Sequence, residues 1–372
     1  MFQPDRLKLI RLAHANMQAD YAEKIGVTRQ FINQIEGGDR APNEETLNAL
    51  CQLTGTKPSY FDRPITVWIA EAQCNFRKQK TTSKAFANQV IARATLVSEF
   101  LSWLANHIEL PAVSLPHVDL SRNSTPENAA EKVRTEWSLG EDAPIDSVTR
   151  TLENAGVICV SATGISEKIS ALSVDGRRPI VLHNGEYAQP TRLRFDMAHE
   201  FGHLVMHRGM TTGDDETEEQ ADQFAAALLM PKKAFAREFP KSRSGRFHWP
   251  GLVSMKKRWG VSLRAVVRRA YSLGLIDAVQ YKSGNVYLNS RGWAKSEPYE
   301  PNEPETPESL PMAVSVLRDH LNIYGDEISE VLGVSAAFLE ELLGLSFPTR
   351  LPHRTNVVSL KAYGGLRGAG TK

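Results

Sequence analysis

One stretch of this 372-residue chain decides its fold: Arg194-Phe-Asp-Met-Ala-His199-Glu200-Phe-Gly-His203-Leu-Val-Met-His207. His199 and His203 are four residues apart on an apolar helical background, so both side chains lie on one face of a helix and can bind one metal ion. Glu200 follows the first histidine, where its carboxylate can take a proton from a metal-bound water. The pattern predicts a hydrolytic metal site with Glu200 as the catalytic base. Two core histidines beside an unrelated glutamate are the alternative.

A second predicted helix, residues 218–230, supplies the rest of this site. A hydrolytic zinc site needs three protein ligands and one open position, and Glu218 is the predicted third ligand. Asp222 lies four residues on, hence on the same face, and is predicted to accept the second ring proton of a histidine ligand. Glu219 is the neighbouring alternative ligand, although it lacks such a partner. Gly202 is costly inside a helix, which indicates that the two helices pack closely.

The same residues limit the metal and the class of enzyme. Zinc fits the predicted ligands, but Mn²⁺ and Fe²⁺ are not excluded, because selectivity also depends on geometry and availability. Gly209 stands where a metzincin has its third histidine, so that class is excluded. His207, Tyr187 and Tyr271 are candidates for stabilising an oxyanion. A surface or core role is more frequent for side chains supported only by proximity or residue type.

The composition indicates a globular cytoplasmic protein of two or three domains. A net charge of +1 gives no overall signal for nucleic acid. Cys51, Cys74 and Cys159 are odd in number and far apart, which favours a reducing compartment over disulfides or a cysteine-based zinc site. The N-terminus has no apolar signal core, and no apolar run reaches the roughly 18 residues of a membrane span, so no membrane partner is expected.

Residues 18–37 have the spacing of a helix-turn-helix. Ala22 is small where two helices cross, Gly26 suits the left-handed turn between them, and Thr28 can cap the second helix. The second helix then exposes polar side chains, several of the types that pair with base edges in the major groove. The predicted DNA-contacting residues are Thr28, Arg29, Gln30, Asn33 and Gln34.

Together with the segment that follows it through Phe61, this region resembles the lambda-repressor-like (Xre) family. The resemblance implies an all-helical DNA-binding domain over residues 1–64. Lys plus Arg and Asp plus Glu each number 8 there, so strong unspecific phosphate binding is not expected. Binding to a double-stranded DNA operator is expected to depend on base contacts and on a homodimer. A helix-turn-helix fold used only for dimerisation or protein contacts is the alternative.

Residues 65–125 are predicted to form a helical connector, and a new domain is predicted from residue 126. In that domain, two helices precede a small sheet, and the metal-binding helices follow it. The strand just before the metal-binding helix, Pro179–His183, is expected to receive an extended substrate as an added strand. The predicted strands are residues 156–160, 169–174 and 179–183.

This order of helices, small sheet and paired metal-site helices resembles the ImmA/IrrE family of metallopeptidases over residues 126–298. The resemblance rests on Ala198-His199-Glu200-Phe-Gly-His203-Leu, Glu218, Ala221-Asp222, Trp259-Gly-Val-Ser262 and Gly292-Trp293. It implies a zincin-like domain in which His199, His203 and Glu218 bind the metal and Glu200 is the base. It also implies a protein substrate, because this family cuts a bacterial regulator, often a helix-turn-helix repressor, in stress response or mobile-element control.

The C-terminal end repeats part of the N-terminal pattern. Residues 299–310 are acidic and proline-rich, which predicts an extended linker, and residues 311–372 are predicted to form a small helical unit. Gly333-Val-Ser matches the turn at Gly26, but Glu340 and Glu341 replace polar reading residues and would repel phosphate. We expect a helix-turn-helix-like unit that does not read DNA, with an ordinary helical hairpin as the alternative. One hypothesis is that it mimics, or docks on, the repressor fold that the peptidase recognises.

The predicted fold class is therefore α+β and mainly helical, with an all-α helix-turn-helix domain, a zincin-like metallopeptidase domain with a small sheet, and a helical C-terminal unit. Because Glu200 is present beside all three predicted ligands, the sequence favours a regulatory zinc-dependent endopeptidase fused to a DNA-binding domain. The alternative is a transcriptional regulator, either an autorepressor or an antitoxin-like protein, whose peptidase-like domain only senses a ligand or a metal.

Overall fold

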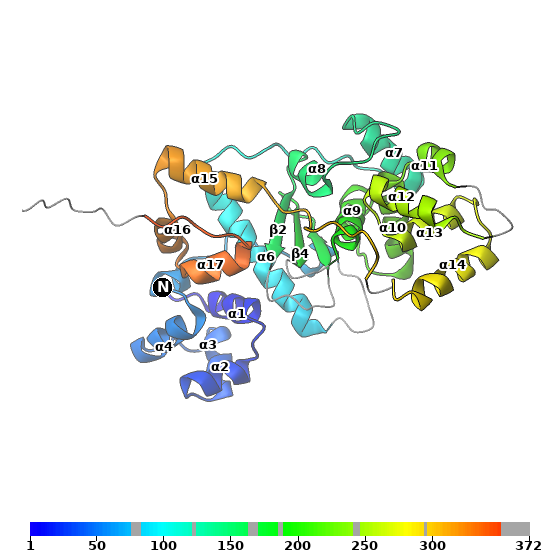
Figure 1. Cartoon of the computed structure of the whole chain (residues 1–372). Helices are drawn as coiled ribbons and strands as arrows, with labels where there is room; N and C mark the ends of the chain where they lie inside the picture. Colours follow the sequence, from blue (N-terminus) through cyan, green and yellow to red (C-terminus); the bar gives the residue numbers. More distant parts are fainter. Residues whose placement is uncertain are drawn as a thin grey trace, which may run out of the picture.

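Helices make up most of the fold, and one small sheet lies between them (Figure 1). The computed structural model describes residues 1–75, 83–120, 124–162, 170–184, 189–240, 246–293 and 296–350. The fold class is α+β and mainly helical, as the sequence predicted. Within these ranges, none of the helices combines the length and the hydropathy that crossing a bilayer requires.

The N-terminal helices have the helix-turn-helix geometry that the sequence predicted. Gly26 ends α2 in the left-handed conformation with a φ of 74°, and Thr28 Oγ1 accepts a hydrogen bond from the Phe31 amide at 3.2 Å. Ile32 and Ile35 of α3 are fully buried, and they hold this helix against the rest of the domain. These helices are α1 (Pro4–Ala13), α2 (Gln18–Ile25), α3 (Arg29–Glu36), α4 (Glu44–Thr54) and α5 (Pro58–Phe61).

The sheet has four strands in the order β1-β3-β4-β2. β2 and β4 are parallel, whereas β3 is antiparallel to both β4 and β1. β4 therefore has a neighbour on each side, and the prediction that Pro179–His183 receives a substrate strand is wrong, because an added strand needs a free edge. The strands are β1 (Cys74–Asn75), β2 (Ile158–Ala162), β3 (Ala171–Val174) and β4 (Ile180–Asn184).

Two apolar clusters pack against the two faces of the sheet. Ile158 and Val160 of β2 belong to the first cluster and Cys159 belongs to the second, as expected for a strand that is buried on both faces. The first cluster also contains the core of the helix-turn-helix domain, much of helix α6 (Lys84–Leu104) and the C-terminal helices. The predicted connector thus contributes a central core helix. The boundaries at residues 64, 125 and 298 stay predictions.

The second cluster is built by helices that lie on the other side of the sheet (Figure 1). α9 and α10 carry the predicted metal-site residues, and α7 packs on both of them. These helices are α7 (Pro126–Glu136), α8 (Val148–Asn154), α9 (Pro190–Met206), α10 (Asp215–Leu229), α11 (Lys232–Glu238), α12 (Trp249–Trp259), α13 (Leu263–Ser272) and α14 (Ala278–Ser290).

The acidic segment before the C-terminal helices is bound to the helices around α9. Glu300 pairs with the buried Lys256, and Glu305 pairs with Arg194 of α9. The amides of Glu308 and Ser309 both donate to the Glu153 carboxylate. The segment is therefore extended as predicted, but it is a strap fixed by ion pairs and not a free spacer.

The C-terminal helices repeat the local geometry of α2 and α3. Gly333 ends α16 with a φ of 70°, and Ser335 caps α17 by accepting from the Phe338 amide at 3.2 Å. This turn lies against the N-terminal domain, because the Ser335 amide donates to the Gly55 carbonyl at 2.6 Å and the Lys57 amide donates to the Gly333 carbonyl at 2.8 Å. The helices are α15 (Ser309–Leu321), α16 (Gly325–Leu332) and α17 (Ala336–Leu343). Residues 351–372 of the predicted unit lie outside the described ranges.

Candidate metal centre

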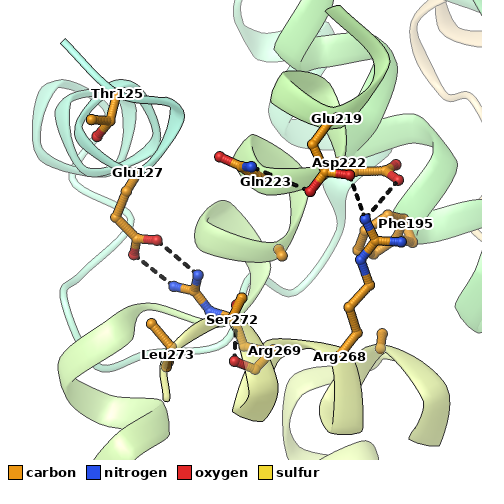
Figure 2. Close-up of a pocket in the computed structure, with 12 residues that line it drawn as sticks. Thr125, Glu127, Phe195, Glu219, Asp222, Gln223, Arg268, Arg269, Ser272 and Leu273 are labelled. Carbon is orange, nitrogen blue, oxygen red and sulfur yellow. Dashed lines mark hydrogen bonds and ion pairs between the residues drawn. The ribbon is translucent and has the colours of Figure 1, made fainter. Parts of the chain in front are cut away.

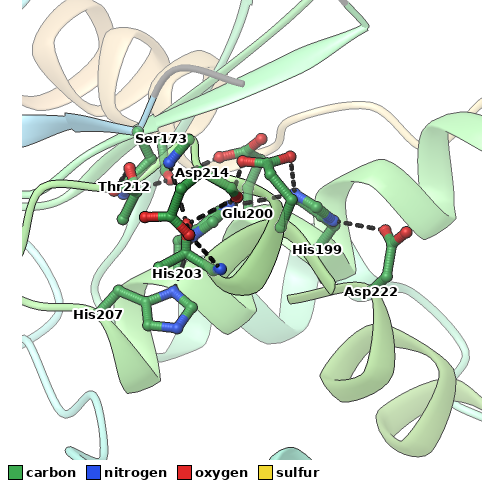
Figure 3. A network of polar contacts seen from close by, with 12 residues as sticks. Ser173, His199, Glu200, His203, His207, Thr212, Asp214 and Asp222 are labelled. Atoms are coloured by element: carbon green, nitrogen blue, oxygen red, sulfur yellow. Dashed lines mark hydrogen bonds and ion pairs between the residues drawn. The ribbon is translucent and has the colours of Figure 1, made fainter. Parts of the chain in front are cut away.

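The site forms where α9 and α10 pack most closely. A Cβ placed on Gly202 of α9 would lie only 3.0 Å from the ring of Phe224 on α10, so a larger residue would push the helices apart. The close packing predicted from this glycine is confirmed. It brings Glu218, near the start of α10, beside His199 and His203 of α9. Figure 3 shows these two histidines with Glu200 and Asp222.

Three donor atoms converge at this point. His199 Nε2 lies 3.1 Å from His203 Nε2, and the Glu218 carboxylate oxygens lie 3.5 Å and 3.6 Å from these two nitrogens. Zinc–ligand bonds of about 2.0–2.2 Å in a tetrahedral site place donor atoms roughly 3.3 Å apart. The three side chains therefore fit a four-coordinate metal ion with one position left for water or substrate. They form the His/Cys/Asp/Glu group with metal-site spacing in the described ranges.

Asp222 fixes the orientation of His199. Its Oδ1 lies 2.8 Å from His199 Nδ1, so the ring donates its Nδ1 proton there and turns Nε2 toward the metal position. Glu219, the alternative ligand, points away from the histidines and pairs with Arg268 at 2.7 Å. Figure 2 shows Arg268 reaching toward both Glu219 and Asp222 beside a cavity of about 240 Å³.

His203 is oriented by a chain of side chains that the sequence did not predict. His203 Nδ1 lies 2.9 Å from His207 Nδ1, and His207 Nε2 lies 2.8 Å from Gln220 Oε1. Gln220 Oε1 can only accept, so His207 donates to it through Nε2 and accepts through Nδ1. His203 then carries its proton on Nδ1, which leaves its Nε2 lone pair free for a metal ion.

The other candidates for an oxyanion role do not gather at the site. His207 is buried behind His203, where it supports a ligand and does not face the open position. Tyr271 is exposed on α13 and stacks on Tyr281 at 4.7 Å between ring centroids. Tyr187 lies outside the described residues. His207 and Tyr271 thus have the core and surface roles that the sequence analysis favoured over an oxyanion role.

Glu200 lies beside the three donors but binds a strand. Its Oε2 accepts a hydrogen bond from Ser173 Oγ of β3 at 2.6 Å, and the carboxyl group is buried. Burial raises the pKa of Glu200 to about 7, although nearby His199 and the Ser173 hydrogen bond act in the opposite direction. A carboxyl group with this pKa can both take and return a proton near neutral pH.

Electrostatic interactions hold the side chains of this site together. Burial alone would raise the pKa of Glu218, but its contacts with His199 and His203 lower that pKa to about 2. Burial likewise opposes the charged form of His199, yet the carboxylates of Asp222 and Glu218 raise the pKa of this histidine. A metal ion held by these residues would therefore find the Glu218 carboxylate ionised, and its binding would require His199 to release a proton.

The predicted DNA-contacting residues lie together on the outer face of α3. Thr28, Arg29, Gln30 and Asn33 are exposed, and Gln34 is half-buried. α2 and α3 lie at the far end of the N-terminal domain, away from the sheet and the metal-site helices (Figure 1). Within the described ranges, most of these side chains are therefore exposed on one helix face.

Sequence reasoning missed Ser173, Gln220 and the whole of β1. Ser173 is one serine in a short strand, and Gln220 is one glutamine on a helix whose acidic residues attract attention first. β1 is two residues long, too short to show the alternation that identifies a strand. Only three-dimensional contacts mark them: Ser173 with Glu200, Gln220 with His207, and β1 with β3.

Comparison with protein-family models identifies two domains in the chain. A helix-turn-helix model matches residues 7–61, and a peptidase-family model described as the IrrE N-terminal-like domain matches residues 158–271. The second match runs from β2 into α13 and includes both metal-site helices. No curated protein matches the chain in sequence. The chain thus joins an N-terminal helix-turn-helix domain, a DNA-binding fold, to a peptidase-type domain.

Proposed function

We propose that this chain, which joins a helix-turn-helix domain to an IrrE N-terminal-like peptidase domain, is a regulatory zinc-dependent endopeptidase. The observation that carries the proposal is the convergence of His199, His203 and Glu218 at distances that suit a tetrahedral ion, with Glu200 beside them. A protein that only sensed a metal would need the ligands but not a buried carboxyl group next to the open position. Zinc is the proposed metal, and Mn²⁺ and Fe²⁺ are the alternatives that metal analysis would distinguish.

The protein's own residues divide the work of hydrolysis. A zinc ion held by the three ligands would polarise the scissile carbonyl and make water a stronger acid. Glu200 takes the proton of the attacking water and passes it to the leaving nitrogen, a cycle suited to a pKa of about 7. Asp222 and the pair His207–Gln220 keep the two histidine rings in the tautomers that binding requires.

The helix-turn-helix domain would bring the peptidase to DNA. We propose that Thr28, Arg29, Gln30, Asn33 and Gln34 contact an operator in the major groove, and that two copies of the chain bind as a homodimer. The support is the exposure of this polar face on a well-capped α3. The proposed substrate is another regulatory protein, such as a helix-turn-helix repressor, in keeping with the family resemblance of the metal-site motifs.

The decisive experiment compares new protein N-termini in cells that carry the native chain with those in cells that carry Glu200→Gln. This substitution keeps the size and leaves the three ligands in place, but it removes the base. New N-termini that depend on Glu200 would establish the peptidase and identify its substrate. Equal zinc content in both purified proteins is the required control. If no protein is cut by the native chain alone under several stresses, the peptidase proposal fails.

A second candidate function is transcriptional regulation without proteolysis, as an autorepressor or an antitoxin-like protein that senses a ligand. One observation favours it: a cavity of about 700 Å³ lies behind Asp222 and is lined by Phe195, Arg268 and Trp293, among others. A small molecule bound there would touch the residue that orients His199. For such a sensor, operator affinity would change with the ligand or with zinc, and Glu200→Gln would not alter that response.

A further inference from the structure

The outer edge of β3 is the sheet edge next to the catalytic base. β3 is the strand that packs most extensively on α9, and its Ser173 donates to Glu200 at 2.6 Å. An extended peptide that paired with this edge would run directly past Glu200. Adding a strand to a sheet edge is a general way for a protein to bind an extended segment.

In this chain the edge is already occupied by β1. Cys74 lies opposite Val174, and Asn75 lies opposite Ser173, in antiparallel register. Just before β1, the Asp175 amide donates to the Gln73 carbonyl at 2.7 Å, and Gln73 Nε2 donates to the Asp175 carbonyl at 2.8 Å. The connector segment is therefore held in the place where an added strand would lie.

The side chain of Asn75 bridges two walls of the metal site. Its Nδ2 donates to Ser173 Oγ at 3.0 Å, and its Oδ1 accepts from Thr212 Oγ1 at 2.9 Å. Thr212 lies in the segment that leads into α10, the helix that carries Glu218. Figure 3 shows Ser173 and Thr212 beside each other. Asn75 is only 7% exposed, so the chain closes over the approach to Glu200 from this side.

We propose that β1 is a built-in occupant of the substrate edge, and that the peptidase is held inactive until an extended protein segment replaces β1 on β3. This proposal rests on the proposed peptidase function and specifies its substrate class: a segment that pairs antiparallel with β3 and places a small polar side chain opposite Ser173. β1 has only two residues, so a longer substrate strand forms more backbone hydrogen bonds with the edge than it displaces.

The position of β1 in the chain links this occupant to the DNA-binding part. β1 lies between α5 and α6, and Arg6 of α1 joins the chain just after α5 to α6. The Arg6 side chain donates to Glu99 of α6 at 2.6 Å and to the carbonyls of Arg63 and Pro64 at 2.8 Å each. A shift of the helix-turn-helix domain relative to α6 would therefore change the separation of the two ends of the connection that carries β1.

A reversible cross-link tests whether β1 must leave. Since residues 73 and 175 are joined by a backbone hydrogen bond, Cys74 and Val174 form the next, non-hydrogen-bonded pair, whose Cα separation of about 4.5 Å suits a disulfide. Val174→Cys in a Cys51→Ser background would be oxidised with oxidised glutathione, which accepts the two electrons and two protons of the thiols. Mass spectrometry would confirm an intramolecular bond, and dithiothreitol would reverse it.

The readouts are cleavage of a quenched fluorescent casein by the zinc-loaded full chain and binding of labelled casein to the same protein carrying Glu200→Gln. We expect the oxidised form to cleave and bind at least tenfold less than the reduced form. Equal cleavage and binding in both forms would show that β1 is a fixed strand and overturn the proposal. Because binding is measured without turnover, it decides the question of β1 even if the reduced protein cleaves nothing, a result that would count against the peptidase function alone.

A second variant addresses the inhibition directly. Gln73→Ala combined with Asn75→Ala removes the side-chain hydrogen bonds that hold β1 and the residue before it on β3. It leaves the three predicted ligands and Glu200 unchanged. We expect this variant to cleave casein several-fold faster than the native chain at equal zinc content. Slower cleavage would contradict inhibition and assign Asn75 a supporting role in the site.

Discussion

The outer face of α3 and the metal centre between α9 and α10 use polar residues in opposite ways. On α3 the predicted DNA-contacting side chains are exposed, apart from the half-buried Gln34, and Asn33 accepts a hydrogen bond from Gln18 at 3.2 Å on the surface. At the metal centre, His199, His203 and Glu200 are at least 93% buried, and each has a specific partner. The side chains on α3 would gain their partners only when a ligand binds, whereas those of the metal centre are already held in place by contacts within the chain.

This difference predicts different responses to mutation. A buried group that loses its partner leaves an unpaired polar atom, and the neighbouring groups reorient. An exposed group that is removed is replaced by water, so the loss is confined to the bond that it would make with a ligand. We therefore expect large, cooperative effects at the metal centre and small, graded effects on α3.

Removal of a metal ligand should have the largest effect. We expect Glu218→Ala to lose bound zinc and to lower the rate of casein cleavage by a factor on the order of 10⁴ or more, because both the Lewis acid and the activated water depend on the ion. Operator binding at equal protein concentration should be unchanged. Metal content, cleavage and DNA binding would be measured on one preparation. Loss of DNA binding together with zinc would show that the metal centre and the outer face of α3 are not independent of each other.

Asp222 should show the next largest effect. Asp222→Asn keeps the size but weakens the acceptor that orients His199, so we expect roughly a 10- to 100-fold loss of zinc affinity or activity. Glu219→Gln is the matched control: Glu219 contacts the same Arg268 from the same helix but is half exposed and does not touch a histidine. Equal losses in both variants would assign the effect to Arg268 and not to the orientation of His199.

The features that the sequence could predict are those set by local spacing. His199, Glu200 and His203 lie within one helical turn or so, and the i, i+4 spacing alone places the two histidines on one face. The turn at Gly26 and the cap at Thr28 are equally local, and the structure confirms both. The fold class followed from such local signals repeated along the chain.

What the sequence could not predict depends on contacts between distant segments. The neighbours of β4 are β3 and β2, so its inner position follows from the sheet order and not from its own apolar pattern. Ser173 reaches Glu200 from another element, and Asn75 reaches Ser173 across 98 positions of sequence. The acidic strap is an analogous case, because its composition predicts an extended chain but cannot show that Glu305 pairs with Arg194.

A buried histidine of the sheet gives a prediction about pH. Burial lowers the pKa of His183 on β4 to about 4, compared with a usual value of 6.5. The unfolded chain thus binds a proton at this position more readily, so stability is complete above pH 6.5 and falls as the pH drops from about 6.5 to 4. We expect about 2 kcal/mol of lost stability at pH 5 from this group.

Urea unfolding at pH 7 and pH 5, for the native chain and for His183→Leu, would measure that contribution. The native chain should lose more stability than the variant between these two values by about 2 kcal/mol. No exposed residue of α3 should show such a difference, because its environment is the same in the folded and unfolded chain. A pH response unchanged by His183→Leu would assign the acid sensitivity to other buried groups.

The smallest expected effect concerns single residues of α3 and their counterparts on α17. With a duplex selected from random DNA by the native chain, Arg29→Ala should weaken binding by about 1–2 kcal/mol, roughly 5- to 30-fold.

Ala336 holds the same place on α17 and is exposed, so Ala336→Arg is the matched gain of a reading residue. We expect no gain in affinity, because Glu341 of α17 pairs with Arg93 and Glu340 accepts from the Phe347 amide, contacts that commit this helix to the body of the protein. A gain with Ala336→Arg comparable to the loss with Arg29→Ala would instead make α17 a second reading helix. The turns at Gly26 and Gly333 would then differ in sequence but not in function. An exposed polar face such as that of α3 would no longer distinguish the DNA-binding helix from a helix that packs on the body of the protein.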